Sequence, residues 1–295
     1  MAGGYDGDDR LNTVELLGDT TCSIPNLPHT IIDSPQMFLN DQKELVICGG
    51  YPKSASCLRL FNGEWHEYAE LEEERQFASV VSMDDKTFIF GGDGSDTSSE
   101  ILQDGSWKEG PTIPGEGITE GCGVAISKEE LLLIGGKYTR NRIIKYNIKT
   151  NNWTEVATLK VGRYEHSCTL FKNQVFITGG YDGFNDLNSV ETLSLKTMTI
   201  KEESNGLQVG RGCHGSGLFH LDGLQVGRGC HGSGLVHLDG KLKLAVFGGC
   251  NSDSLDLIEL FDEDTETWKL SQTLILSEEK KDFGYISVPS HLICP

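Results

Sequence analysis

The sequence contains no long apolar run. No stretch reaches the roughly 18 apolar residues that a membrane-spanning helix needs, so we expect no segment to cross a bilayer. Residues 1–7 (MAGGYDG) lack both the basic and the apolar region of a signal peptide. These absences predict a cytoplasmic protein. The alternative is an extracellular one, if the N-terminus is incomplete and the cysteines are paired.

Basic residues are scarce as well. The chain has 25 Lys and Arg against 44 Asp and Glu, which gives a formal net charge of -19. A surface this acidic repels the phosphates of nucleic acids and of anionic lipids. We therefore expect neither nucleic acid nor a membrane as a partner. The excess charge is typical of a well-solvated surface.

Glycine, in contrast, is abundant and recurs in pairs. The 36 glycines follow no collagen period, so they indicate many turns and many short strands. Five Gly-Gly pairs end an apolar run, and these runs with their pairs are 45–50, 87–92, 132–136, 175–180 and 244–249. A sixth pair, Gly3-Gly4, has no such run before it. The second glycines of the six pairs stand at positions 4, 50, 92, 136, 180 and 249. All steps but the last are similar, and their length fits four ordinary strands with their turns.

All four tryptophans share one phase of this repeat. Trp65, Trp107, Trp153 and Trp268 follow the second glycines at 50, 92, 136 and 249 at similar distances along the chain. One large aromatic residue per sheet indicates packing between adjacent sheets. The order of apolar run, Gly-Gly, loop, a strand such as 189–193 (SVETL) and then a Trp segment resembles the kelch repeat. The fourth complete repeat departs from it, with Met-Thr-Ile in place of the Trp segment.

The resemblance implies an all-β fold: a six-bladed kelch-type β-propeller with four antiparallel strands per blade, forming a single domain over residues 1–295. The expected blades span approximately 28–71, 72–114, 115–158, 159–203 and 204–274, with a closing blade made from 280–295 plus 1–27. In the closing blade, 283–289 and 291–294 are interpreted as the first two strands, and 13–17 and 21–25 as the last two. Sharing one blade between the termini removes exposed strand edges.

The long last step, from position 180 to 249, has a specific cause. Residues 206–222 (GLQVGRGCHGSGLFHLD) are repeated at 223–239, with Phe219 and Val236 as the one difference. Each copy carries one candidate strand, so two segments compete for one position in the sheet. We expect the second copy to occupy it, because residues 241–249 follow that copy as an ordinary hairpin.

The cysteines allow two interpretations. Of the nine, Cys213 and Cys230 are copies of each other. Cys48 and Cys57 flank one loop and could be neighbours across a hairpin, and a similar Cys-Gly-Gly…Ser-Cys pattern in some secreted kelch proteins implies a disulfide. Buried free thiols are the favoured interpretation.

The duplication also creates an apparent metal motif. Its cysteines and histidines resemble a zinc-binding set, but adjacent Cys-His residues point to opposite faces of a strand. No metal and no cofactor are therefore expected.

Recognition in a propeller is expected in the loops rather than in the sheets. Candidate partner-binding residues follow the Gly-Gly pairs or open the first strand of a blade: Tyr51, Asp93, Ser95, Tyr138, Arg140, Arg142, Arg163, Tyr181, Phe184, Asn185 and Arg228. Arg and Tyr are common interface anchors, and several Arg on one face could hold an acidic peptide. The alternative is that each Arg of the Arg-x-x-His segments attaches a loop to the next blade.

These features favour a non-catalytic scaffold that binds a protein or peptide at the loop-rich face, with its oligomeric state open. One alternative is a propeller enzyme acting on a sugar, similar to the sialic-acid mutarotases. However, neither a copper-ligand set nor a Ser-x-Asp-x-Gly-x-x-Trp box occurs. Another is the substrate-receptor half of a ubiquitin ligase, with its BTB part missing or supplied in trans.

Overall fold

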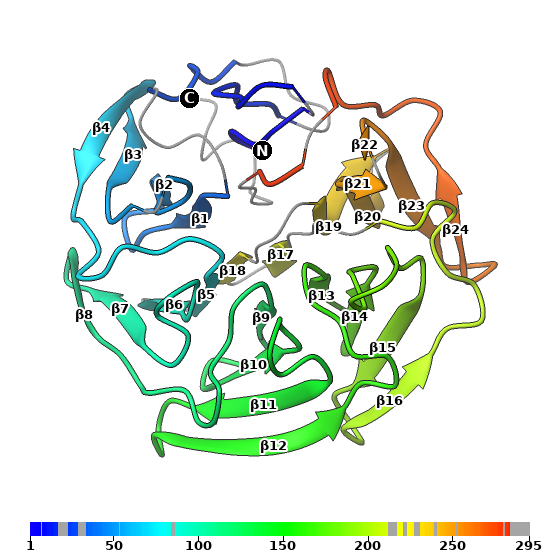
Figure 1. Cartoon of the computed structure of the whole chain (residues 1–295). Coiled ribbons are helices and arrows are strands. Elements are labelled where there is room, and N and C mark those ends of the chain that lie inside the picture. Colours follow the sequence, from blue (N-terminus) through cyan, green and yellow to red (C-terminus); the bar gives the residue numbers. More distant parts are fainter. Residues whose placement is uncertain are drawn as a thin grey trace.

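Five antiparallel sheets of four strands surround a central axis as the blades of a propeller (Figure 1). This is a computed structural model, and each sheet places its strands in chain order from the centre outward. It describes residues 1–6, 8–16, 23–28, 34–52, 54–83, 86–211, 217–220, 223–226, 231–238, 241–251, 253–279 and 281–283.

The blades are built from the following strands. Blade one contains β1 (Gln36–Leu39), β2 (Leu45–Cys48), β3 (Cys57–Phe61) and β4 (Glu64–Tyr68). Blade two contains β5 (Ser79–Met83), β6 (Lys86–Phe90), β7 (Ser99–Gln103) and β8 (Ser106–Glu109). Blade three contains β9 (Cys122–Ala125), β10 (Glu130–Ile134), β11 (Arg142–Asn147) and β12 (Asn152–Thr158).

The remaining strands follow the same order. Blade four contains β13 (Ser167–Phe171), β14 (Gln174–Thr178), β15 (Val190–Ser194) and β16 (Thr199–Glu202). Blade five contains β19 (His231–Leu238), β20 (Lys241–Gly248), β23 (Ile258–Asp262) and β24 (Thr267–Leu270). Two hairpins accompany them, β17 (Gly217–His220) with β18 (Gly223–Val226) and β21 (Cys250–Asn251) with β22 (Asp253–Ser254).

Burial decreases from the inner strands to the outer ones. All five residues of β5 are buried, whereas β4 and β12 are mainly exposed or half-buried. Adjacent blades cover both faces of the inner strands, which explains their continuous apolar runs. The outer-strand tryptophans pack on the preceding blade: the ring of Trp107 lies 5.7 Å from Phe38, and that of Trp153 lies 5.8 Å from Phe90. The predicted packing of Trp between sheets is thus confirmed for these two.

The Gly-Gly turns of blades one to four each fasten their blade to the next one. The second glycine of the pair has φ near +100°, a conformation that L side chains rarely adopt. Its N–H donates to the linker that leads to the following blade, as in Gly92 to Ile118 (3.0 Å) and Gly136 to Arg163 (3.1 Å). The first glycine is equally confined, since a Cβ on Gly135 would lie 2.7 Å from the carbonyl oxygen of Arg163. Only glycine therefore fits between two blades here.

The prediction of six blades is wrong, because the described residues form five four-stranded sheets. In the expected closing blade, Gly3 and Gly4 do form the turn, and Tyr5 exchanges backbone hydrogen bonds with Lys281 (2.8 and 2.9 Å). Within the described part of the chain, however, this segment makes isolated bridges rather than a four-stranded sheet. Parts of the strands expected there, 17–22 and 284–295, lie outside the described residues. Gly3-Gly4 lacks the apolar run that forms the buried inner strand in the five blades.

The duplicated segment is used in two places. The second copy supplies β19, which pairs with β20, so the prediction for this copy is confirmed. The first copy supplies Arg211, whose guanidinium donates to Glu259 (2.5 Å) and to the carbonyl of Gly248 (2.8 Å). The additional hairpin β17–β18 lies beside the inner strands β1, β5, β9, β13 and β19, at the centre of the ring (Figure 1).

The additional copy separates the arginine of blade five from its strand. In blade four, Arg163 stands three positions before His166, which directly precedes β13. In blade five, Arg211 belongs to the first copy, whereas the equivalent His231 belongs to the second. The difference between the two spacings equals the length of one copy.

Deleting residues 212–228 should therefore restore the spacing of blade four and leave a propeller of at least equal stability. This product retains Val in the strand, where Val236 is buried among Ala245, Phe247 and Ile258. Deleting 223–239 instead retains Phe, and the larger side chain should cost about 1–3 kcal/mol. Thermal unfolding followed by circular dichroism compares the two variants. A large loss of stability in both would show that the central hairpin is required for folding.

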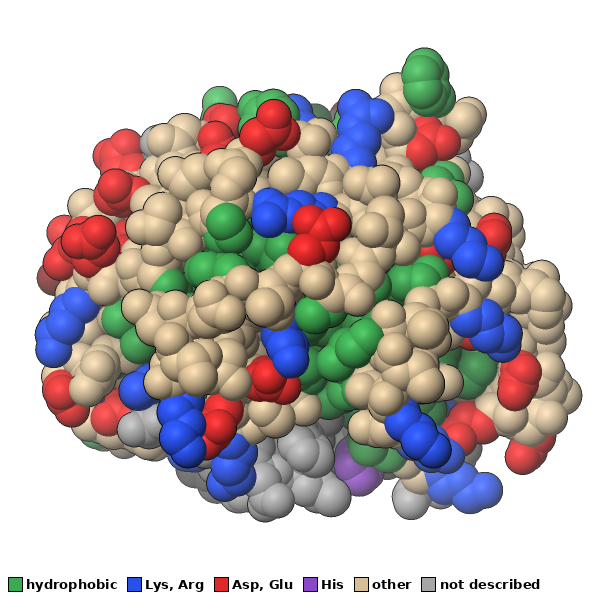
Figure 2. Space-filling view, turned by 90° about the horizontal axis from the view of Figure 1, so that it is seen from below, with side chains coloured by type: hydrophobic (Ala, Val, Ile, Leu, Met, Phe, Trp, Pro, Cys, Tyr) green, Lys and Arg blue, Asp and Glu red, His purple; other side chains and the backbone are tan. Residues whose placement is uncertain are grey.

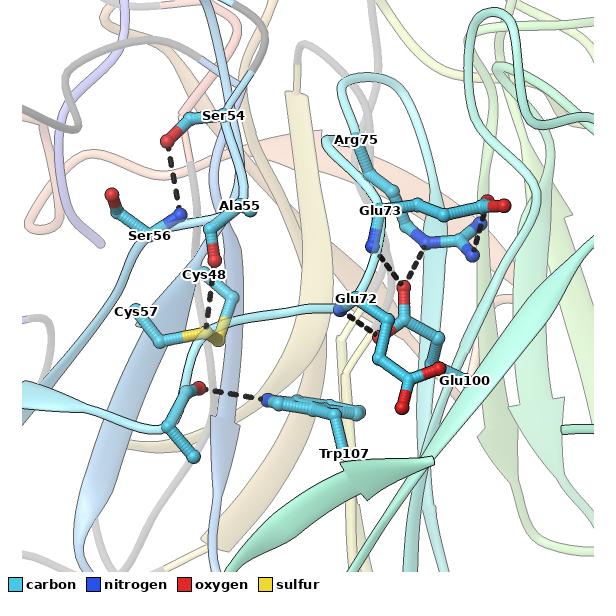
Figure 3. The surroundings of a disulfide bond; sticks show 11 residues. Cys48, Ser54, Ala55, Ser56, Cys57, Glu72, Glu73, Arg75, Glu100 and Trp107 are labelled. Atoms are coloured by element: carbon cyan, nitrogen blue, oxygen red, sulfur yellow. Dashed lines mark hydrogen bonds and ion pairs between the residues drawn. A yellow bond between two sulfur atoms is a disulfide. The ribbon is translucent and has the colours of Figure 1, made fainter. Parts of the chain in front are cut away.

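Two disulfides lie within the described residues, where the sequence favoured free thiols. Cys48 and Cys57 are opposite each other in β2 and β3, with Cα atoms 4.1 Å apart (Figure 3). Cys122 of β9 and Cys168 of β13 join blade three to blade four, with Cα atoms 6.0 Å apart. The second pair, separated by 46 residues, has no local signal in the sequence.

Replacing Cys122 by Ser should destabilise the protein more than replacing Cys48. The inter-blade bond closes a longer loop, 46 against 9 residues, which in the chain-entropy account adds about 1.4 kcal/mol. Chemical denaturation of the two variants measures this difference. Peptide mapping without reductant should recover both linked pairs, and alkylation of all four thiols in the native protein would contradict the pairing.

Candidate protein-binding surface

The loops that follow the Gly-Gly pairs share one rim of the ring with the linkers between blades. Lys137 donates its backbone N–H to the carbonyl of Thr119 (2.9 Å), and Tyr164 and Tyr181 exchange two backbone hydrogen bonds (3.1 and 2.9 Å). We call this side the loop rim. The short turns between the first and second strands, and between the third and fourth, form the opposite side, the turn rim.

Arg163, a predicted binding residue, lies in the interior rather than on the loop rim. Its side chain is fully buried and donates to Glu191 (2.8 Å) and to the carbonyl of Gly179 (2.7 Å). Glu191 also accepts the backbone N–H groups of Lys160 (2.8 Å) and Val161 (3.1 Å). The network ties the linker to the third strand and to the Gly-Gly turn, as the alternative interpretation of these arginines expected.

The same network recurs in blades two and five. Arg75 donates to Glu100 (2.9 Å) and to the carbonyl of Gly91 (2.7 Å), and Arg211 binds Glu259 in the same way. Figure 3 shows the Arg75–Glu100 pair beside the first disulfide. Blade three has two isoleucines, Ile118 and Ile144, at the equivalent positions, and both belong to one apolar cluster.

A neutral histidine lies next to this network in blade four. His166 is fully buried, and its Nε2 lies 3.2 Å from the Sγ of Cys122. Burial and the positive charge of Arg163 lower the pKa of His166 to about 3. The imidazole is therefore uncharged near neutral pH and acts as a packing residue between blades three and four.

In contrast to the buried arginines, Arg140 is exposed and is the centre of a cluster of side chains on the loop rim. Its Nη1 donates to the carbonyl of Asp182 (2.7 Å), and its guanidinium lies 5.4 Å from the ring of Tyr164. Tyr164 in turn packs edge-on against Tyr181 at 5.5 Å. Arg140 thus lies over Tyr164, which in turn packs against Tyr181 of the following loop. Tyr164 was not among the predicted binding residues. Its position directly after Arg163 is the feature of the sequence that could have indicated it.

Phe184 projects from the neighbouring loop. Its side chain is 83% exposed, the largest fraction among the exposed large apolar residues of the described chain. The carboxylate of Asp182 accepts the backbone N–H groups of Phe184 and Asn185 (both 2.7 Å), which orders the loop. The N–H groups of Asn185 and Phe184 also hold the pKa of Asp182 below its ordinary value.

We group the side chains of these neighbouring loops as the tyrosine–arginine patch: Tyr138, Arg140, Tyr164, Tyr181 and Phe184. Tyr138, at 55% exposure, belongs to the same loop as Arg140. Arg142 lies at the start of β11 and is engaged internally, because it binds Glu155 (3.3 Å) and the carbonyl of Pro114 (2.8 Å).

The other predicted residues that the structure describes belong to blades one and two. The exposed ring of Tyr51 carries the guanidinium of Arg10 at 4.5 Å. Asp93 accepts a hydrogen bond from Gln76 (3.0 Å), and the backbone N–H of Ser95 donates to the carbonyl of Gly92 (2.9 Å). Arg228 lies outside the described residues.

The charge of the surface is mixed on a local scale. In a side view, Lys and Arg alternate with Asp and Glu across the visible face, and acidic side chains gather at the upper left (Figure 2). Among the described residues, no three His, Cys, Asp or Glu side chains converge as metal ligands do. The same part of the chain contains no helix long and apolar enough to cross a bilayer.

Comparison with known proteins extends this description. No protein-family model matches the chain. It is 37% identical to human Kelch-like protein 6 over 65 residues, 34% to human Kelch-like protein 24 over 87, and 38% to human Kelch domain-containing protein 10 over 86. Its homologues are kelch proteins.

The kelch resemblance expected from the repeats is therefore confirmed, at modest identity and over part of the chain. The three alignments cover 22%, 30% and 25% of this chain, and 10%, 14% and 20% of the respective relatives. At the level of the family, kelch relatives and a propeller fold support a protein-interaction role.

Replacing Arg163 by Ala should destabilise the propeller by about 3–5 kcal/mol, because it leaves Glu191 buried without its positive partner. Replacing both residues by Ile, as at positions 118 and 144 of blade three, should recover about 2 kcal/mol of that loss. Urea denaturation measures both values. An Arg163→Ala variant of unchanged stability would return Arg163 to the binding candidates.

Proposed function

We propose that the protein is a non-catalytic scaffold that binds a protein or peptide through the tyrosine–arginine patch. The observation that supports this most is that contacts within the protein already hold the exposed residues in place. Arg140 is held by Asp182 and Tyr164, and Phe184 is presented on a loop ordered by hydrogen bonds. Exposed aromatic and arginine side chains that are already ordered lose little conformational entropy on binding.

The buried arginines support a non-catalytic role. An enzyme that acts on an acidic sugar needs arginines free to bind the substrate carboxylate. In this chain, Arg75, Arg163 and Arg211 are buried and each is paired with a glutamate of its own blade. They therefore serve the fold, and the exposed arginine of the patch is left for recognition.

The partner's chemistry follows from the patch. Arg140 offers donors to a carboxylate, and the aromatic rings offer apolar area around it. An acidic segment with an apolar side chain is the ligand that fits both. The substrate-receptor role in a ubiquitin ligase would use the same patch, with the cullin-binding part in another chain or domain.

Phe184→Ala and Arg140→Glu should each reduce capture of the partner at least tenfold, because each removes an anchor of about 1.4 kcal/mol or more. Affinity purification with quantitative mass spectrometry compares the variants with the wild type. Phe61→Ala is the matched control, since Phe61 is also exposed but borders the turn rim. Equal loss with all three variants, or with none, would contradict the patch as the binding site.

A further inference from the structure

A second candidate site lies on the turn rim, between blades four and five. It is a pocket of about 190 Å³ with an aromatic floor. Phe171 of β13, Phe176 of β14 and Phe261 of β23 form this floor, with ring centroids 6.2 Å apart for the first pair and 5.3 Å for the second. The pocket is thus built by inner and outer strands of two blades, which fix its shape.

Charged side chains surround the floor. Lys172, in the turn between β13 and β14, binds Glu263, and Lys201 of β16 binds Glu203 (2.7 Å). Each lysine is therefore neutralised by its own glutamate. The exposed carboxylate of Glu266 is the fifth charge, so two positive and three negative groups give the lining a net charge of -1.

The protein already places a cation on this floor. The ammonium of Lys172 lies 5.4 Å from the ring centroid of Phe171, within the range of a cation–π interaction. The same ammonium is paired with Glu263 across the boundary between the two blades. Lys172 thus makes the contacts that an external basic group would make with an aromatic floor and a carboxylate.

We propose that this pocket binds a basic side chain, arginine or lysine, of a partner peptide, and that Lys172 occupies the position until the peptide displaces it. The charge favours such an occupant twice, through the net charge of -1 at the pocket and through the -19 of the whole chain. A guanidinium has the flat shape that stacks on phenyl rings while it donates to Glu263 or Glu266. The site is on the opposite rim from the tyrosine–arginine patch and does not depend on it.

A peptide of minimal complexity tests the proposal. The probe is acetyl-Gly-Gly-Arg-Gly-Gly-amide. The control is the same peptide with citrulline in place of arginine, which keeps the shape of the side chain without its charge. Two-dimensional NMR titration of the intact protein should show the arginine peptide shifting the amides of Gln174 and Phe176, and the citrulline peptide binding at least fivefold more weakly. Equal binding of both peptides, or shifts spread over the acidic surface, would overturn the proposal.

Two substitutions should change the affinity in opposite directions. Lys172→Ala frees the ring of Phe171 and should raise the affinity about threefold to tenfold. Glu266→Gln removes a negative charge and should lower it. Lys149→Ala is the matched control, because Lys149 forms an exposed ion pair with Glu129 in blade three. All three side chains are exposed, so the melting curves of the three variants should coincide with that of the wild type. An unchanged peptide affinity in Lys172→Ala would refute the displacement of Lys172.

Discussion

The hydrogen bond between a Gly-Gly turn and the next linker is the contact on which the rest of the ring depends. Gly92 and Gly136 each donate to the following blade from a backbone conformation with φ near +100°. The linker of the next blade also occupies the space that a Cβ on Gly135 would need. This contact fixes the spacing of adjacent blades, and it also sets where each loop of the loop rim begins.

The buried arginines add a second set of interactions at the same junction between blades. In blades two, four and five a glutamate of the third strand collects two linker N–H groups and one guanidinium, which satisfies an otherwise costly buried charge. Blade three fills the equivalent space with Ile118 and Ile144. A polar and an apolar solution therefore coexist in one ring: the buried glutamate is paired with an arginine, and the two isoleucines carry no polar side-chain group.

The two rims differ in what they offer a partner. The loop rim presents Arg140 and Phe184 on ordered loops, which suits an acidic segment with an apolar side chain. The turn rim has a phenylalanine-floored pocket with a net negative lining, which suits a basic side chain. The two proposed sites lie on opposite rims, so their ligands would not compete for the same surface.

Local patterns in the sequence determined the inner strands, the Gly-Gly turns and the second copy's place in the sheet, since each depends on residues close together in the chain. The phase of the tryptophans in the repeat indicated packing between sheets, and the structure supplied the partners, Phe38 for Trp107 and Phe90 for Trp153. The tertiary structure alone decided the rest. The predicted sixth blade was wrong, because the described residues near the two termini make isolated bridges rather than a four-stranded sheet. The sequence left Arg163 between a binding role and a structural one, because nothing in it shows that Glu191, on the third strand of the blade, faces Arg163 in the interior. Cys122 and Cys168, like Arg140 and Tyr164, are brought together by the curvature of the ring, which a linear pattern does not contain.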